Sequence, residues 1–119
     1  MSLFDWNSVP REAMTPLLTR QVIHTSLMTV ARLEMKAGAV VPVHAHHNEQ
    51  ITTVQSGCLR FLLENGPLLV TAGQVLTLAP HETHGVEVVE DSVAIDFFTP
   101  RREDWITGDD AYLRGGSQG

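Results

Sequence analysis

The sequence has little of what marks a secreted, membrane-spanning or nucleic-acid-binding protein. Cys58 is its one cysteine, so no disulfide can form within the chain, and a lone thiol fits a reducing compartment. No apolar run approaches the roughly 18 residues of a membrane helix, and no leader pattern is present, so we expect a cytoplasmic protein. The net charge of −6, without blocks of like charge, argues against nucleic acid and membrane surfaces as partners.

A long helical pattern is also missing. Short β-prone runs follow one another instead, and they are separated by turn residues such as Asn65-Gly66, which is typical of a tight hairpin. The expected strands are 20–25, 27–35, 49–55, 59–63, 68–71, 74–78, 85–89 and 92–98. Many short strands without crossover helices predict an all-β jelly-roll barrel and exclude a parallel βαβ architecture.

The chain is expected to form a single domain over residues 1–119, with a barrel core at roughly 20–99. Residues 1–16 are expected to be an irregular arm, with room for one helical turn at residues 11–14. Thr99 as N-cap, Pro100 at the first helical position and Gly108 as the stop predict a short C-terminal helix over 100–107. The glycine-rich end is expected to be a flexible tail.

The most informative stretch contains two histidines at i and i+2. On a strand, the side chains of His44 and His46 point to the same face and can hold one ion between them. Gln50 shares their parity, so on a continuous strand it is the favoured third ligand. A bulge at residues 47–48 would turn Glu49 inward instead, and this alternative stays open.

A second segment supplies the remaining candidate ligand. His84 opens a returning strand and is favoured over His81, which lies in the preceding turn, whereas His24 and His47 are expected to be non-ligands. Three imidazoles and one carboxamide form a neutral set, so a divalent ion keeps its full charge for Lewis-acid chemistry. Imidazole-rich sites accept Ni, Zn, Fe, Mn, Co or Cu, and the sequence does not choose among these metals.

These two segments resemble the two sequence motifs of the cupin family. The first is matched by Gly38-x5-His44-x-His46-x3-Gln50-x6-Gly57, with glutamine where many cupins carry glutamate, and the second, more loosely, by Gly73-x6-Pro80-x3-His84. The resemblance extends roughly from Trp6 to Trp105 and implies a single-domain cupin barrel, also called a double-stranded β-helix. Small cupins often pair through a sheet face, so a homodimer is expected.

A narrower resemblance is to the small single-domain cupins of the KdgF-like group, through the additional pattern Asp96-x-Phe98-x-Pro100-x-Arg102. The resemblance implies that Asp96 is catalytic, that Phe98 binds the substrate, and that Arg102 takes part in catalysis and in substrate binding. It also implies a metal site made by His44, His46, Gln50 and His84. The implied reaction is the linearisation of 4,5-unsaturated uronates, released by pectin or alginate breakdown, to open-chain 5-keto-4-deoxyuronate.

The chemistry of these residue types agrees with that expectation. Asp96 stands in an otherwise apolar strand, where a carboxylate must be paired, lie near the metal or be protonated, unless it faces solvent beside a basic neighbour. Phe98 shares the face of Asp96. Arg102 can grip a carboxylate through two bonds, as a uronate requires, or it can be a solvated helix charge paired with Glu103 or Asp104.

Two other functions remain open from the sequence. One is an iron or copper dioxygenase that acts on a small organic substrate, because a cupin metal site can also support oxygen chemistry. The other is a module that binds a metal and a small ligand without turnover. The spacing of Asp96, Phe98 and Arg102 beside the histidines favours the enzyme that acts on a carboxylate-bearing sugar.

Overall fold

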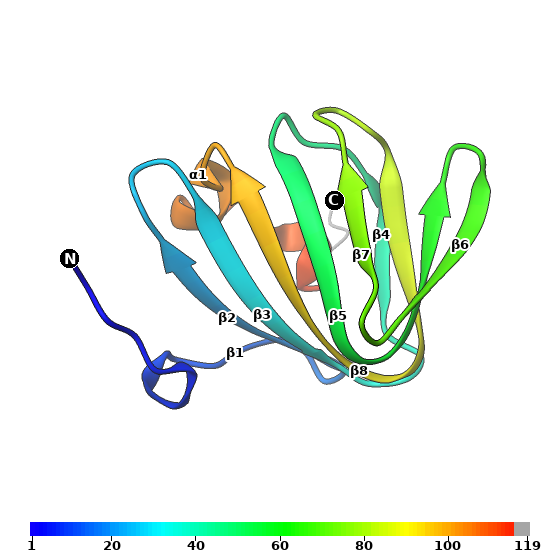
Figure 1. Ribbon diagram of the computed structural model, residues 1–119, viewed down its shortest axis with the longest axis horizontal. Coiled ribbons are helices and arrows are strands. Elements are labelled where there is room, and N and C mark those ends of the chain that lie inside the picture. The colour runs from blue at the N-terminus through cyan, green and yellow to red at the C-terminus, as the bar shows by residue number, and fades with distance from the viewer. Residues whose placement is uncertain (116–119) are drawn as a thin grey trace.

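The computed structural model describes residues 1–115, which form one curved antiparallel sheet with little helix (Figure 1). The strands are β1 (Glu12–Thr15), β2 (Leu18–His24), β3 (Thr29–Met35), β4 (Val40–His44), β5 (Glu49–Leu63), β6 (Gly66–Thr71), β7 (Val75–Leu78) and β8 (His84–Thr99). The helical segments are η1 (Trp6–Ser8), α1 (Glu103–Ile106) and η2 (Ala111–Leu113). The predicted all-β barrel with a short C-terminal helix is confirmed.

Two long strands, β5 and β8, connect all parts of the sheet. They pair antiparallel from Glu49–Thr99 at one end to Leu63–His84 at the other. The C-terminal half of β8 also pairs with β3, and its N-terminal half pairs with β4. In the same way β5 pairs with β7 and then with β6. Because each long strand takes part in both walls, the sheet curls into the cup seen in Figure 1.

The bend in β5 lies at Gly57. The pairing of β5 with β8 shifts register on both sides of this residue, and Gly57 has a φ of +91°. A Cβ atom at this position would lie 2.2 Å from Oγ of Ser92 and 2.4 Å from the carbonyl oxygen of Asp91. The Ser92 hydroxyl accepts a hydrogen bond from the N–H of Cys58 at 3.0 Å. Glycine is therefore the residue that this bulge requires.

This bulge corrects two of the predicted strand ends. The separate strands expected at 49–55 and 59–63 are one strand, β5, because Gly57 bends the chain without reversing it. The strands expected at 85–89 and 92–98 are likewise one strand, β8, which runs through the same bend beside β5. The expected hairpin is present, but its two-residue loop is Glu64-Asn65, because Leu63 pairs with Gly66 and Gly66 already begins β6.

The N-terminal arm is more regular than predicted. Residues 12–15 form β1, which pairs antiparallel with β2, so the helical turn expected at residues 11–14 is wrong. Met14 is buried while Ala13 is exposed, and this alternation places one face of the short strand against the core. Tertiary pairing with β2 has therefore overridden a weak local preference for helix.

The C-terminal helix lies inside the predicted range but begins later. Thr99 still belongs to β8, the Thr99–Pro100 peptide bond is cis, and Arg102 occupies the N-cap position that was expected for Thr99. Gly108, with a φ of +84°, follows the helix end as predicted. Of the expected flexible tail, residues 116–119 lie outside the described residues.

The barrel interior is largely apolar, but it also holds several buried polar side chains. Large buried residues such as Leu59, Phe61 and Phe98 form the core, and their removal from water drives folding. Buried polar residues lie on the same inner faces, and the ones that matter below are Gln50, Thr52, His84, Asp96 and Arg102. Because such groups cost stability unless they are paired, they point to a functional site.

The outer surface carries several exposed apolar side chains, among them Ile51, Leu69 and Val75. A sheet face with such residues could pair with a second copy of the chain, and the expected homodimer stays a prediction. Among residues 1–115, no helix is long and apolar enough to cross a membrane.

Candidate metal centre

Three imidazoles meet at one end of the barrel. His44 ends β4, His84 begins β8 directly opposite it, and His46 lies in the connection between β4 and β5. One ring nitrogen from each residue lies within 4.8 Å of the other two, which is close enough for a single ion to bind all three. The ring centroids of His44 and His84 are 4.4 Å apart. The sequence-predicted histidines are thus brought together.

Each ring is fixed by the backbone in the same way. The Nδ1–H of His44 donates to the carbonyl of Pro42 at 2.7 Å, that of His46 to Asn48 at 3.0 Å, and that of His84 to Glu82 at 2.8 Å. Because a carbonyl can only accept, the proton resides on Nδ1 in all three rings. The three Nε2 atoms are therefore left unprotonated, as metal coordination requires.

Burial also keeps these imidazoles neutral. Desolvation lowers the pKa of both His44 and His46 to about 4, and the charge of Arg102 contributes in the same direction. The pKa of His84 is lowered by the same main cause. A neutral imidazole is the form that binds a metal ion, so the cluster is ready to bind one at neutral pH.

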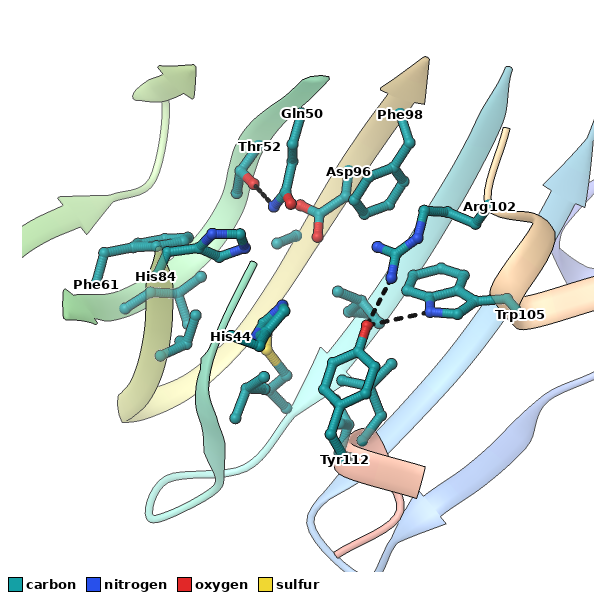
Figure 2. Close-up of a pocket in the computed structure, with 18 residues that line it drawn as sticks. His44, Gln50, Thr52, Phe61, His84, Asp96, Phe98, Arg102, Trp105 and Tyr112 are labelled. Atoms are coloured by element: carbon teal, nitrogen blue, oxygen red, sulfur yellow. Dashed lines mark hydrogen bonds between the residues drawn. The ribbon is translucent and has the colours of Figure 1, made fainter. Parts of the chain in front are cut away.

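Gln50 directs its side-chain oxygen toward this cluster. Its Nε2 donates to Oγ1 of Thr52 at 2.9 Å (Figure 2). Its Oε1 lies 3.1 Å from Nε2 of His46. Both of these facing atoms carry lone pairs, and a cation between them would satisfy both. The residues present therefore fit a metal ion, with a neutral set of three imidazole nitrogens and one amide oxygen.

The competing candidates lie away from the cluster. Glu49 and His81 are both exposed, and His81 is not part of the three-histidine group. The parity argument assumed one continuous strand, whereas His46 lies in a loop between β4 and β5. Gln50 still faces inward, because it alternates with Ile51 at the start of β5.

Asp96 lies beside Gln50 and Thr52 on the inner face of β8 (Figure 2). Its side chain is buried, and Oδ1 has no hydrogen-bond partner among residues 1–115. Desolvation raises the pKa of Asp96 to about 7, although a hydrogen bond from Thr52 and the charge of Arg102 act in the opposite direction. Asp96 can therefore both hold and release a proton near neutral pH, and it does not face solvent.

Arg102 is buried rather than solvated. Its Nε and Nη2 donate to the two carboxylate oxygens of Asp104 at 3.0 and 2.7 Å. Its guanidinium packs against two adjoining aromatic rings, 4.7 Å from the centroid of Phe98 and 4.2 Å from that of Trp105. The ion pair with Asp104, which the sequence left open, is present, and the Arg102 side chain also lines the pocket.

One cavity of about 60 Å³ is lined by polar side chains of this site together with apolar residues of the barrel core; the polar ones are His44, Gln50, Thr52, His84, Asp96 and Arg102. Sequence reasoning missed Thr52 and Tyr112 as lining residues. Thr52 could have been found, because it follows Gln50 at i+2 on the same strand face. Tyr112 carries no such signal, since it lies in η2 beyond the expected helix and reaches the cavity through tertiary packing alone.

Comparisons with known proteins agree with this fold. The sequence model of the cupin domain matches residues 31–98. The pectin degradation protein KdgF of Dickeya dadantii (strain 3937) is 30% identical over 104 residues, covering 84% of this chain and 94% of the relative.

Two solved structures also superpose closely. One is KdgF from Halomonas sp., with a TM-score of 0.81, 29% identity and coverage of 87% of this chain and 99% of the other. The second is an RmlC-like cupin from Shewanella frigidimarina NCIMB 400, with a TM-score of 0.82, 25% identity and coverage of 88% and 96%.

Proposed function

This chain belongs to the cupin family as a small single-domain member of the KdgF-like group, and on that premise we propose that it is a metal-dependent enzyme acting on a sugar acid. The proposed reaction is the linearisation of 4,5-unsaturated uronates to 5-keto-4-deoxyuronate, a step in pectin breakdown. The observation that carries the proposal is a cluster of three imidazoles, two of which line one cavity together with a buried carboxyl group and a buried guanidinium. The name of the Dickeya relative supports the substrate class.

We assign the metal ligands to His44, His46, Gln50 and His84. The ion would supply a positive charge that stabilises negative charge developing on a substrate oxygen. Its identity is left to metal analysis, because imidazole and amide ligands accept Ni, Zn, Fe, Mn, Co or Cu. The reaction changes no oxidation state overall, so a metal without redox chemistry suffices.

Asp96 is the proposed proton-transfer group. In the reaction the bond between C1 and the ring oxygen breaks, the C1 hydroxyl loses its proton to give an aldehyde, and the resulting enol at C5 becomes a ketone as C4 gains a proton. The balance is an isomerisation that moves one proton. A carboxyl group with a pKa of about 7 is suited to accept that proton and return it at neutral pH.

Arg102 and Phe98 are the proposed substrate-binding residues. A uronate carries one carboxylate, and a guanidinium holds a carboxylate through two parallel hydrogen bonds. The rings of Phe98 and Trp105 fix the plane of the Arg102 guanidinium and shield it from water. This arrangement would orient the substrate with its ring toward Asp96 and the imidazoles.

The test is a rate measurement on the purified, metal-analysed protein. 4,5-Unsaturated galacturonate is added, and the ultraviolet absorbance of its conjugated double bond is followed with metal-loaded and with chelator-treated protein. We expect loss of absorbance faster than in buffer, abolished by chelation and unchanged when oxygen is removed. No acceleration by the loaded protein would refute the uronate reaction, and a rate that required oxygen would favour a dioxygenase.

A further inference from the structure

Tyr112 of η2 is one of the polar side chains that line the cavity. Its hydroxyl oxygen accepts a hydrogen bond from Nη2 of Arg102 at 2.7 Å and another from Nε1 of Trp105 at 3.2 Å (Figure 2). Its ring lies 4.6 Å from the ring of His44, measured between centroids. Tyr112 therefore bridges the metal-ligand side of the cavity and its guanidinium side.

The bonds of Arg102 define where a carboxylate can bind. A guanidinium offers two edges that match a carboxylate, the edge of Nε with Nη2 and the edge of Nη1 with Nη2. Asp104 occupies the first edge with both of its oxygens. The Tyr112 hydroxyl occupies the Nη2 half of the second edge, while Nη1 has no partner among residues 1–115.

A carboxylate ligand that binds Arg102 through two hydrogen bonds must therefore displace one of these two residues. Replacing Asp104 would exchange one carboxylate for another and leave the Asp104 charge without its partner. Replacing the Tyr112 hydroxyl would exchange a neutral acceptor for a charged one, which forms the stronger hydrogen bond with arginine. Displacement of Tyr112 is thus the favourable route.

We propose that Tyr112 is a specificity-determining residue that occupies the carboxylate subsite of the free protein and yields it to the acidic ligand. With Tyr112 in place, its hydroxyl holds Nη2 of Arg102, so a carboxylate cannot bond to Nη1 and Nη2 together without this movement. The inference rests on the proposed function only in taking Arg102 as the group that binds the substrate carboxylate.

The movement belongs to the side chain of Tyr112 rather than to the whole segment. On one side of it, Asp110 is buried and accepts a hydrogen bond from Nη2 of Arg20 at 2.9 Å. On the other side, Leu113 is buried in the barrel core. Because the backbone is anchored at both neighbours, the hydroxyl leaves Arg102 by rotation of the tyrosine side chain.

Removing the competing hydroxyl should strengthen binding of an acidic ligand. The apparent dissociation constant of a site that is open for only part of the time is raised by the inverse of that fraction. In Tyr112→Phe the ring remains but the bond to Arg102 is lost, so the open fraction increases. We expect about a tenfold lower dissociation constant for a uronate, which corresponds to about 1.4 kcal/mol.

The experiment uses zinc-loaded full-length protein and galacturonate, a saturated uronate that cannot undergo the reaction. Calorimetry compares its binding to the wild type and to Tyr112→Phe, with the neutral sugar galactose as the ligand control. In parallel, the indole N–H signals are followed by NMR. The chain has two tryptophans, so Trp6 serves as the internal reference for Trp105. Galacturonate should move the Trp105 signal in the wild type, because the bond to Tyr112 breaks.

The outcomes distinguish the proposed role of Tyr112 from the proposed role of Arg102. If the dissociation constant is unchanged in Tyr112→Phe but binding is weaker in Arg102→Gln, then Tyr112 does not occupy the subsite, and Arg102 remains the carboxylate-binding residue. Unchanged binding in Arg102→Gln would show that Arg102 does not bind the carboxylate, and this would also overturn the proposed role of Tyr112. A Trp105 signal that stays in place at saturating galacturonate would also contradict displacement of Tyr112.

Discussion

The side-chain oxygen of Gln50 lies 3.1 Å from Nε2 of His46, and neither atom has a proton to share with the other. The proton of His46 is on Nδ1, which donates to the carbonyl of Asn48, and the amide hydrogens of Gln50 point toward Thr52. Two lone pairs at this distance repel unless a cation lies between them. The relationship supports Gln50 as the fourth ligand beside the three histidines.

Replacing Gln50 tests that assignment. We expect Gln50→Ala to lower the affinity for Zn²⁺ or Ni²⁺ by roughly 10–100-fold, because one ligand and its orienting bond to Thr52 are lost. The measurement is competition with a coloured chelator at neutral pH. Gln55→Ala is the matched control, since Gln55 lies on the same strand and is exposed. Equal affinities in the two variants would exclude Gln50 from the metal site.

The free energy of unfolding of the metal-free protein should depend on pH through the ionisation of Asp96. Burial raises the pKa of this group from 3.8 to about 7. Its contribution to stability is therefore full below pH 3.8 and is lost as the pH rises through about 7, because the unfolded chain ionises first. In Asp96→Asn the free energy of unfolding does not fall with pH for this reason. The buried histidines change stability with pH in the opposite direction, but they do so equally in the variant and in the wild type.

We expect the free energy of unfolding of Asp96→Asn to rise relative to that of the wild type by on the order of 4 kcal/mol between about pH 4 and about pH 8. Urea unfolding of both metal-free proteins across this range measures the difference. A difference that stayed constant with pH would mean that Asp96 is ionised throughout.

The bend of β5 should tolerate only glycine at position 57. Gly57→Ala places a Cβ atom 2.2 Å from Oγ of Ser92 in a backbone conformation with φ of +91°. Gly38→Ala is the matched control, because Gly38 has a φ of +93° and no atom within 4 Å of the added Cβ.

We expect Gly38→Ala to cost about 1–2 kcal/mol from backbone strain, and Gly57→Ala to cost at least a further 1–3 kcal/mol from overpacking. Urea unfolding at one pH gives both values. Similar losses in the two variants would contradict a close contact at the bulge.

The buried ion pair between Arg20 and Asp110 should anchor the segment that carries Tyr112. Both side chains are 3% exposed, and removing the Asp110 carboxylate leaves the buried guanidinium with the partly exposed Glu12 as its acidic partner. We expect Asp110→Ala to lower the free energy of unfolding by about 1–3 kcal/mol. The neighbouring Asp109 is exposed, and Asp109→Ala should change it by less than about 0.5 kcal/mol. A small effect of Asp110→Ala in thermal or urea unfolding would show that the anchor lies elsewhere.

Much of the fold could be predicted because its signals are local. Alternating strands, a hairpin signal at Asn65-Gly66 and the absence of helical periodicity were enough for an all-β barrel. The length of β5 was not predictable in this way. A Ser-Gly pair has the same composition in a turn and in a bulge, and the choice depends on Ser92, which approaches from another strand.

Some residues of the site could be predicted from local sequence and others could not. His44, His46 and His84 follow from their spacing, and the inward position of Gln50 follows from the alternation of side chains along β5. The lining role of Tyr112 depends on how the chain beyond α1 folds back onto the barrel, and this return is set by the tertiary contacts of Asp110 with Arg20 and of Leu113 with the core.

The most direct test of the account compares wild type and Asp96→Asn, each loaded with the same amount of metal, for loss of the double-bond absorbance of 4,5-unsaturated galacturonate. The account predicts that the wild type accelerates the loss and that Asp96→Asn lowers kcat by roughly 10²–10⁴-fold with metal content unchanged, because the proton-transfer group is gone. A variant as fast as the wild type would contradict the proposed role of Asp96, and no activity in either protein would contradict the uronate reaction.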